Sequence, residues 1–260
     1  MRGEWLEYLA VFVASAALCV VLTPYVMRIA VRGNLLDSPG GHKSHHTAVP
    51  YLGGVAIVLA FTTAVVVFAI LEAPHGGSKE LFIVLALAVL LSVVGLVDDL
   101  RHVSPLWRVA AEVAVALVVW SLGTGVTVSG IGALDLGLTV LWIVGITNAF
   151  NLLDNMDGLC AGVALITGFS LLLGMGPMSE LSLEVVFLVA LLGGTAGFLV
   201  YNFHPASIFM GDSGSLLIGL SLAVLSLGSE GLPGGSSNLL TVVGAPVLVL
   251  LIPILDTTLV

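Results

Sequence analysis

Four short polar segments interrupt an otherwise apolar chain, at residues 37–46, 98–99, 148–158 and 202–214. Each of them contains acids, amides or histidines. Placing a carboxylate beside hydrocarbon costs about 2.5 to 3.5 kcal/mol on insertion scales, so acids kept in such surroundings usually mark a functional site. We therefore expect the chemistry of this protein to take place at these segments.

The third segment carries an amide or an acid at every third position, at Asn148, Asn151, Asp154 and Asp157. Residues three apart are neighbours on a helix surface, so a helical or 3₁₀-like segment would stack these oxygen atoms in one column. Such a column suits a nucleotide or Mg²⁺, which takes oxygen ligands. An ordinary polar loop is the alternative, because Asp157-Gly158 is typical of a turn.

The fourth segment ends at Gly211-Asp212-Ser213, where a further helix is expected to begin. The N-terminus of a helix presents unpaired backbone N–H groups and a partial positive charge, which favour phosphate. Asp212 could hold a cation that bridges to that phosphate. Helix capping by Asp212 or Ser213 is the alternative, and the two roles can coexist.

The second segment consists of adjacent acids, Asp98 and Asp99, at the end of the apolar run 89–97. Two neighbouring carboxylates either face a cation or repel each other. Local neutralisation by Arg101 is the alternative to a functional role. The acids of the third segment favour the functional one.

The first segment is a basic loop that contains His42, Lys43, His45 and His46. A zinc site there would lack a fourth ligand at metal spacing. We therefore expect a cationic loop that receives phosphate.

Glu112 lies inside an apolar run and needs a partner there. Arg108, one helical turn earlier, is the natural one. We interpret this pair as structural.

The composition places these segments in a membrane protein. The chain is 58% hydrophobic and 9% charged, with a mean hydropathy of +1.18, whereas an average soluble domain is about 25% charged. No run alternates with the period of a barrel strand, so we expect an all-α, polytopic transmembrane bundle that forms one domain over 1–260. The expected helices, about nine in number, are 7–30, 51–71, 81–97, 106–122, 137–150, 159–175, 184–201, 213–228 and 239–258.

The basic residues predict the orientation of the bundle. Arg28, Arg32, Lys43, Arg101 and Arg108 fall on one side, against Arg2 and Lys79 on the other. The side richer in basic residues is cytoplasmic, so the N-terminus is expected outside. All four polar segments then face the cytoplasm from the plasma (inner) membrane. Their acids, in a chain with a formal net charge of −9, favour binding of a divalent cation.

Together the segments resemble the polyprenyl-phosphate N-acetylhexosamine-1-phosphate transferases (glycosyltransferase family 4). The matching stretches are Asp37-x-Pro39, Lys43-x-His45, Pro50-x-x-Gly53-Gly54, Asp98-Asp99-Leu100, the run 148–159, Asn202-x-His204-Pro205 and Ile208 to Ser215. The first loop is more similar to the N-acetylglucosamine-1-phosphate branch than to the phospho-MurNAc-pentapeptide transferase. His42 stands where that branch usually has an arginine.

The resemblance implies a phosphoryl transfer from a UDP-sugar to a polyprenyl phosphate, with release of UMP, as a first membrane step of cell-envelope glycan synthesis. The implied cofactor is Mg²⁺, with Mn²⁺ as the alternative ion. The implied partners are the two substrates and the lipid bilayer, without nucleic acid, and a homodimer is left open.

The resemblance also implies roles for individual residues. Asp212 and Asp99 would hold the metal, while Asp98 would act on the lipid phosphate as a catalytic base beside Asp99. The remaining implied contacts are with the substrates, by Lys43, His45, Asn148, Asn151, Asp154, Asp157, Asn202 and Phe209.

Two other classes of function stay open at this stage. A secondary transporter would place its acids near the bilayer midplane, often in two related repeats, and no repeat is visible here. A non-catalytic homologue is the other alternative, because family members continue past 253–257 into a basic loop and further helices, whereas this sequence stops at Val260. We expect a C-terminal truncation, which would leave the site short of positive charge.

Overall fold

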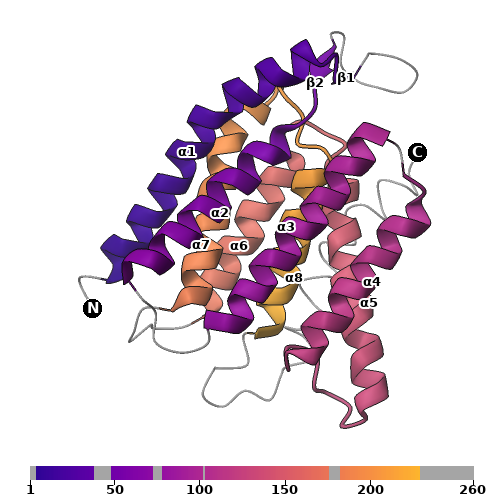
Figure 1. Cartoon of the computed structure of the whole chain (residues 1–260). Coiled ribbons are helices and arrows are strands. Elements are labelled where there is room, and N and C mark those ends of the chain that lie inside the picture. The colour runs from indigo at the N-terminus through magenta and orange to yellow at the C-terminus, as the bar shows by residue number, and fades with distance from the viewer. Residues whose placement is uncertain (1–3, 38–47, 73–77, 102, 176–181, 229–260) are drawn as a thin grey trace.

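The computed structural model describes residues 4–37, 48–72, 78–101, 103–175 and 182–228, which form a helical bundle with one two-stranded sheet (Figure 1). The elements are α1 (Glu4–Arg32), β1 (Leu36–Asp37), β2 (Val49–Pro50), α2 (Gly53–Glu72), α3 (Ser78–Arg101), α4 (Pro105–Ser121), α5 (Gly132–Leu153), α6 (Leu159–Gly174), α7 (Leu183–Asn202) and α8 (Asp212–Gly228).

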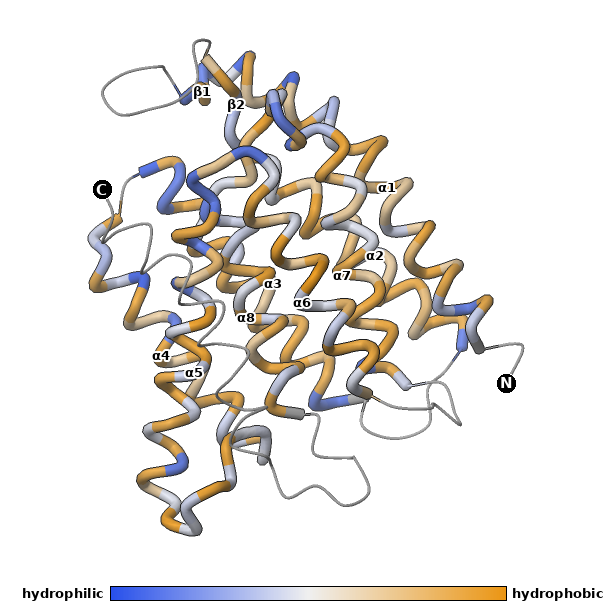
Figure 2. Tube along the Cα trace, turned by 180° about the vertical axis from the view of Figure 1, so that it is seen from behind, coloured by the Kyte–Doolittle hydropathy of each residue, from blue (hydrophilic) through white to orange (hydrophobic). Residues whose placement is uncertain are grey.

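These helices correspond in order to the first eight expected from the apolar runs, which confirms the all-α class. The fifth was expected at 137–150 but spans Gly132–Leu153, because polar residues at its two ends are also helical. The ninth, at 239–258, lies outside the described residues. Within the described part, α1, α2, α3, α5 and α7 are long and apolar enough to cross a membrane, and apolar residues cover most of their length (Figure 2).

Helix α7 is the most buried of the five described helices that are long and apolar enough to cross a membrane. In its most apolar stretch 78% of the residues are buried, against 28% in α1, which lies at one edge. Lipid is as apolar as a leucine side chain, so helices in a membrane associate through close packing of small residues. Gly193 and Gly197 supply such a surface, because a Cβ on either would lie within 2.4 Å of a backbone oxygen of α1.

The start of α8 is packed against the backbones of two other helices. A Cβ on Gly54 of α2 would lie 2.2 Å from the nitrogen of Gly214, and one on Gly95 of α3 would lie 2.5 Å from the oxygen of Asp212. Only glycine permits such an approach without displacement of a neighbouring backbone. The first turn of α8 is therefore fixed relative to α2 and α3.

The short sheet fixes the segment that leads into α8. Strand β1 pairs antiparallel with β2, and Tyr51 forms a parallel bridge with Phe209. The N–H of Phe209 donates to the oxygen of Pro50 at 2.9 Å, and the N–H of Gly53 donates to the oxygen of Phe209 at 2.9 Å. These bonds tie residue 209 to the beginning of α2 and so determine where Asp212 begins the last described helix.

We predict that Gly54→Ala destabilises the protein by about 1 to 3 kcal/mol, because the added methyl group must push α8 away from α2. Thermal unfolding of the detergent-solubilised protein measures the effect as a lower Tm. Gly162→Ala in α6 is the matched control, since its Cβ would meet nothing within 4 Å. Equal Tm values for the two variants would contradict this account of the α2–α8 contact.

Candidate active site

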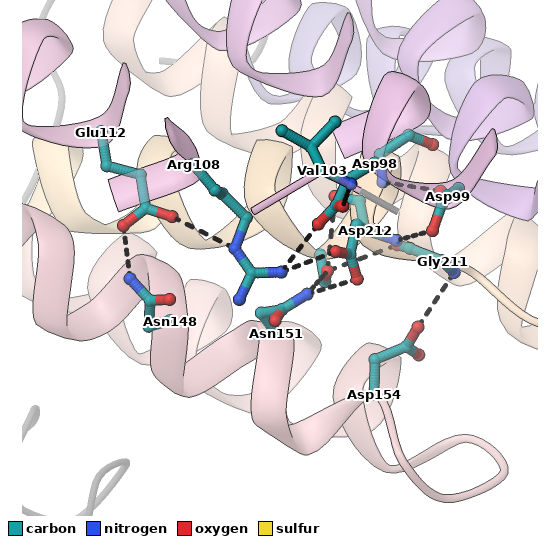
Figure 3. A network of polar contacts seen from close by, with 12 residues as sticks. Asp98, Asp99, Val103, Arg108, Glu112, Asn148, Asn151, Asp154, Gly211 and Asp212 are labelled. Carbon is teal, nitrogen blue, oxygen red and sulfur yellow. Dashed lines mark hydrogen bonds and ion pairs between the residues drawn. The ribbon is translucent and has the colours of Figure 1, made fainter. Parts of the chain in front are cut away.

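Polar side chains from four helices meet at one end of the bundle (Figure 3). The end of α3 supplies Asp98 and Asp99, and α4 supplies Arg108. Asn151 lies in the last turn of α5, and Asp212 is the first residue of α8. Three of the four polar segments thus converge, as expected from the sequence.

Asp212 is held by donors from two helices. Its Oδ2 accepts a hydrogen bond from Arg108 Nη1 at 2.8 Å, and its Oδ1 accepts one from Asn151 Nδ2 at 2.7 Å. Asn151 also donates to Ser215 Oγ at 3.1 Å. The Asp212 side chain remains 26% exposed, so an incoming ligand can reach it.

Asp98 accepts a hydrogen bond from the same guanidinium group of Arg108. Its Oδ2 accepts from Arg108 Nη1 at 3.2 Å, while its Oδ1 accepts from the backbone N–H of Val103 at 2.7 Å. One guanidinium nitrogen therefore bridges two acids that lie far apart in the sequence.

Asp99 binds the N-terminus of α8. Its Oδ1 accepts from the N–H of Asp212 at 3.0 Å, and its Oδ2 accepts from that of Ser213 at 3.3 Å. The N-terminus of α8, which was expected to bind a phosphate, thus binds the carboxylate of Asp99. The partial positive charge of the helix N-terminus stabilises this carboxylate. Gly211 permits this approach, because it has a φ of 75° and a Cβ there would lie 2.7 Å from Asp99 Oδ2.

Asp154 follows the last residue of α5 and faces the same loop. Its Oδ2 accepts from the N–H of Gly211 at 2.9 Å. Burial raises the pKa of the Asp154 carboxyl well above its usual value, and the nearby carboxylates of Asp212 and Asp99 raise it further. The hydrogen bond from Gly211 lowers the pKa but does not offset the burial.

The expected column of four oxygen-bearing side chains is wrong at its last member. The helix ends at Leu153, and the chain turns through Gly158, which has a φ of 70°. Asp157 therefore points elsewhere: its Oδ2 forms a hydrogen bond with His204 Nδ1 at 2.8 Å and accepts from the N–H of Ala206 at 3.0 Å. Contact of Asp157 with a donor substrate stays a prediction.

Asn202 connects two loops. It is 2% exposed, its Oδ1 accepts from the N–H of Gly158 at 3.0 Å, and its Nδ2 donates to the oxygen of Ile208 at 3.0 Å. Phe209 takes part in the bridge to Tyr51 described above. Contact of either residue with a substrate stays a prediction. Lys43 and His45 lie outside the described residues.

The expected pair of Arg108 and Glu112 is present, with Arg108 Nε 4.0 Å from Glu112 Oε1, but each of the two side chains also has other partners. Arg108 Nη1 reaches Asp98 and Asp212, while Glu112 accepts a hydrogen bond from Asn148 Nδ2. One feature of the sequence indicates the contact between Arg108 and Asp98. Helix α4 begins soon after α3 ends, so the first turns of α4 lie beside Asp98. A basic residue at that place is available to those acids.

The chemistry of the Asp98 and Asp212 side chains fits a divalent cation. Mg²⁺ is commonly held by one or two carboxylates, with water and phosphate oxygens completing its shell. Both acids converge on a single positive charge, that of Arg108. Both oxygens of Asp99, by contrast, already accept backbone N–H groups, and the expected role of Asp99 as a metal ligand stays a prediction. Among the described residues, no group of three or more His, Cys, Asp or Glu side chains is arranged to hold a metal.

Comparison with known proteins identifies similar sequences. The family model described as glycosyl transferase family 4 matches residues 81–230. This range contains all the acids of the site, from Asp98 to Asp212, together with Arg108 and Asn151. The chain is 36% identical over 260 residues to the probable undecaprenyl-phosphate N-acetylglucosaminyl 1-phosphate transferase of Bacillus subtilis (strain 168), covering 95% of this chain and 69% of that relative.

Two further relatives differ in their named substrates. The decaprenyl-phosphate N-acetylglucosaminephosphotransferase of Mycolicibacterium smegmatis is 31% identical, over 86% of this chain and 61% of its own length. The phospho-N-acetylmuramoyl-pentapeptide-transferase of Moorella thermoacetica is 34% identical, over 85% of this chain and 76% of its own length. The chain thus spans between 61% and 76% of these two relatives.

We predict that Asp154→Asn gains stability relative to the wild type as the pH rises. The pKa of the Asp154 carboxyl is higher in the folded protein than in the unfolded chain, so its protonated form stabilises the folded state. This stabilisation is lost as the pH rises from the unfolded pKa of about 4 toward the folded pKa. The amide keeps the acceptor for Gly211 and does not ionise. The Tm of the variant minus that of the wild type should therefore increase from about pH 5 to about pH 8.

Asp154→Ala is the control, because it removes both the charge and the hydrogen-bond acceptor. Its Tm should lie below that of the Asn variant throughout the same pH range. A Tm difference between wild type and Asp154→Asn that does not change with pH would refute the raised pKa.

Proposed function

Because the chain belongs to glycosyl transferase family 4, we propose that it transfers a hexosamine 1-phosphate from a UDP-sugar to a polyprenyl phosphate. Its site contains the parts that such a reaction needs: clustered acids, an arginine and a helix N-terminus beside an apolar surface. The observation that carries the proposal is the convergence of Asp98 and Asp212 on one positive charge. Phosphoryl transfer depends mainly on positioning and on neutralisation of charge, which is what such an arrangement supplies.

In the proposed reaction, an oxygen of the lipid phosphate attacks the phosphorus that is attached to the sugar. A new P–O bond forms, the P–O bond to the UMP moiety breaks, and UMP leaves with the electron pair. The products are a sugar diphospholipid and UMP. The acceptor phosphate is already ionised near neutrality, so the step needs no proton removal by Asp98.

Asp98 and Asp212 would hold Mg²⁺ in this proposal, and the ion would neutralise phosphate oxygens of the donor. Asn151 orients the Asp212 carboxylate through its 2.7 Å hydrogen bond. Asp99 and Asp154 hold the backbone of residues 211–213, and thereby the position of Asp212. Arg108 supplies a permanent positive charge beside both acids.

The acceptor would approach from the lipid. Large apolar side chains are exposed on the helices that border the site, among them Val97, Leu100 and Leu106. An isoprenoid chain can lie against such a surface while its phosphate reaches the polar end of the bundle. The positive-inside rule supports a cytoplasmic location for this end, where nucleotide sugars are available.

N-acetylglucosamine 1-phosphate is the group we propose for transfer. Two of the three relatives described above are named for N-acetylglucosamine, including the one that matches over 95% of this chain. Phospho-MurNAc-pentapeptide is the second candidate, supported by the Moorella thermoacetica relative.

Release of UMP tests the proposal directly. The full-length protein in detergent is given undecaprenyl phosphate with either UDP-N-acetylglucosamine or UDP-MurNAc-pentapeptide, with and without Mg²⁺. We expect UMP with the first donor, dependent on both the lipid and Mg²⁺. Release of UMP from UDP-MurNAc-pentapeptide alone would overturn the proposal that N-acetylglucosamine is the transferred sugar. Release from neither donor would overturn the proposed transferase activity.

We predict that Asp212→Asn folds and inserts normally but loses Mg²⁺-dependent turnover by about 100-fold or more, because several kcal/mol of charge stabilisation are removed. The amide keeps one of the two oxygens that accept from Arg108 and Asn151, so the Tm should fall by no more than about a few degrees, as expected for the loss of one hydrogen bond worth about 1 kcal/mol. Initial rates over a Mg²⁺ titration provide the measurement. A variant with the wild-type dependence on Mg²⁺ would exclude Asp212 as a ligand.

A further inference from the structure

Glu112 is a buried acid whose charge has no full partner. Its side chain is 0% exposed, and its Oε1 has no hydrogen bond. The nearest cation is Arg108, one helical turn earlier, whose Nε lies 4.0 Å from that oxygen. The Nε is itself buried and has no hydrogen bond. Two complementary polar atoms thus face each other across a gap slightly too long for a hydrogen bond (Figure 3).

Asn148 fixes the other oxygen of this acid. Its Nδ2 donates both to Glu112 Oε2 and to the backbone oxygen of Val144, at 2.9 Å in the second case. The amide is therefore held by its own helix and in turn holds the carboxylate of the neighbouring helix. Oε1 is left directed toward Arg108.

Arg108 is placed between two sets of acids. Its Nη1 is hydrogen-bonded to Asp98 and Asp212, while its Nε faces Glu112. A guanidinium group carries five N–H donors in a rigid fork, so it can favour one set over the other by a small shift. A buried carboxylate without a partner costs free energy, so Glu112 attracts the guanidinium group of Arg108.

We propose that Glu112, held by Asn148, is a positioning residue that receives the charge of Arg108 when a divalent cation binds to Asp98 and Asp212. The inference rests on the proposed function, because it assumes that this pair of acids binds the cation. A guanidinium and a divalent cation repel each other at the same pair of carboxylates. Movement of Arg108 toward Glu112 relieves that repulsion and closes the 4.0 Å gap.

This role predicts a particular dependence of cation affinity on Glu112. Without its charge, Arg108 stays on the two aspartates and competes with the cation. Glu112→Gln should therefore weaken Mn²⁺ binding by about fivefold to tenfold, whereas Arg108→Gln, which removes the competitor, should strengthen it. In the Arg108→Gln background, Glu112→Gln should have no further effect.

The double-mutant cycle is measured as Mn²⁺ binding to the full-length protein in detergent, by electron paramagnetic resonance of free Mn²⁺. It separates the positioning role from a general loss of negative charge, which would weaken binding equally in both backgrounds. Ser221→Ala is the matched control, because Ser221 is a buried polar residue of α8 whose hydroxyl has no hydrogen bond among the described residues. Its Mn²⁺ affinity should equal that of the wild type.

Equal weakening by Glu112→Gln in both backgrounds, or no weakening in either, would overturn the positioning role. Release of UMP by the wild type would then leave the proposed function standing. Failure of the wild type to bind Mn²⁺ would overturn the cation pair and with it this inference. If Glu112→Gln fails to fold, Asn148→Asp tests the same coupling, since repulsion between the two acids should displace Glu112 and weaken Mn²⁺ binding only when Arg108 is present.

Discussion

The site depends on one physical constraint, which is that carboxylates at the end of an apolar bundle must find donors within the protein. Besides the amide of Asn151 and the backbone N–H of Val103, the structure supplies donors of two other kinds. The N-terminus of α8 donates backbone N–H groups to Asp99, and Arg108 donates to Asp98 and Asp212. Both kinds carry positive charge, one as a helix dipole and the other as a guanidinium. Removal of either would leave acids that repel one another in surroundings of low dielectric constant.

The packing of the bundle follows from this constraint. A helix N-terminus can serve a carboxylate of another helix only if the two backbones approach closely, and Gly95 and Gly211 permit that approach. The bridge between Tyr51 and Phe209 fixes the loop before α8 to the segment that begins α2. The glycines and the short sheet therefore serve the site, even though none of them carries a chemical group that could react.

The sequence predicts the helices well because each one is a long apolar run, and it predicts the polar segments because acids are conspicuous among apolar residues. The contacts between segments are tertiary, so they are harder to predict. Spacing alone placed Asp157 in a column with Asn151, but the helix ends at Leu153 and the next turn directs Asp157 to His204. Likewise, the i,i+4 relation of Arg108 to Glu112 is local, whereas the stronger contacts of Arg108 are with residues of α3 and α8.

The position of Arg108 explains how a site rich in acids can remain folded before its ligands arrive. The guanidinium group of Arg108 neutralises part of the charge of Asp98 and Asp212, and the buried acid Glu112 lies 4.0 Å from its Nε. Exchange of one positive charge for another costs less than exposure of bare carboxylates to one another, because the total charge near the acids changes less. In the proposal that Asp98 and Asp212 bind a divalent cation, the guanidinium group that holds these acids in place without the ion would also set how tightly the ion binds.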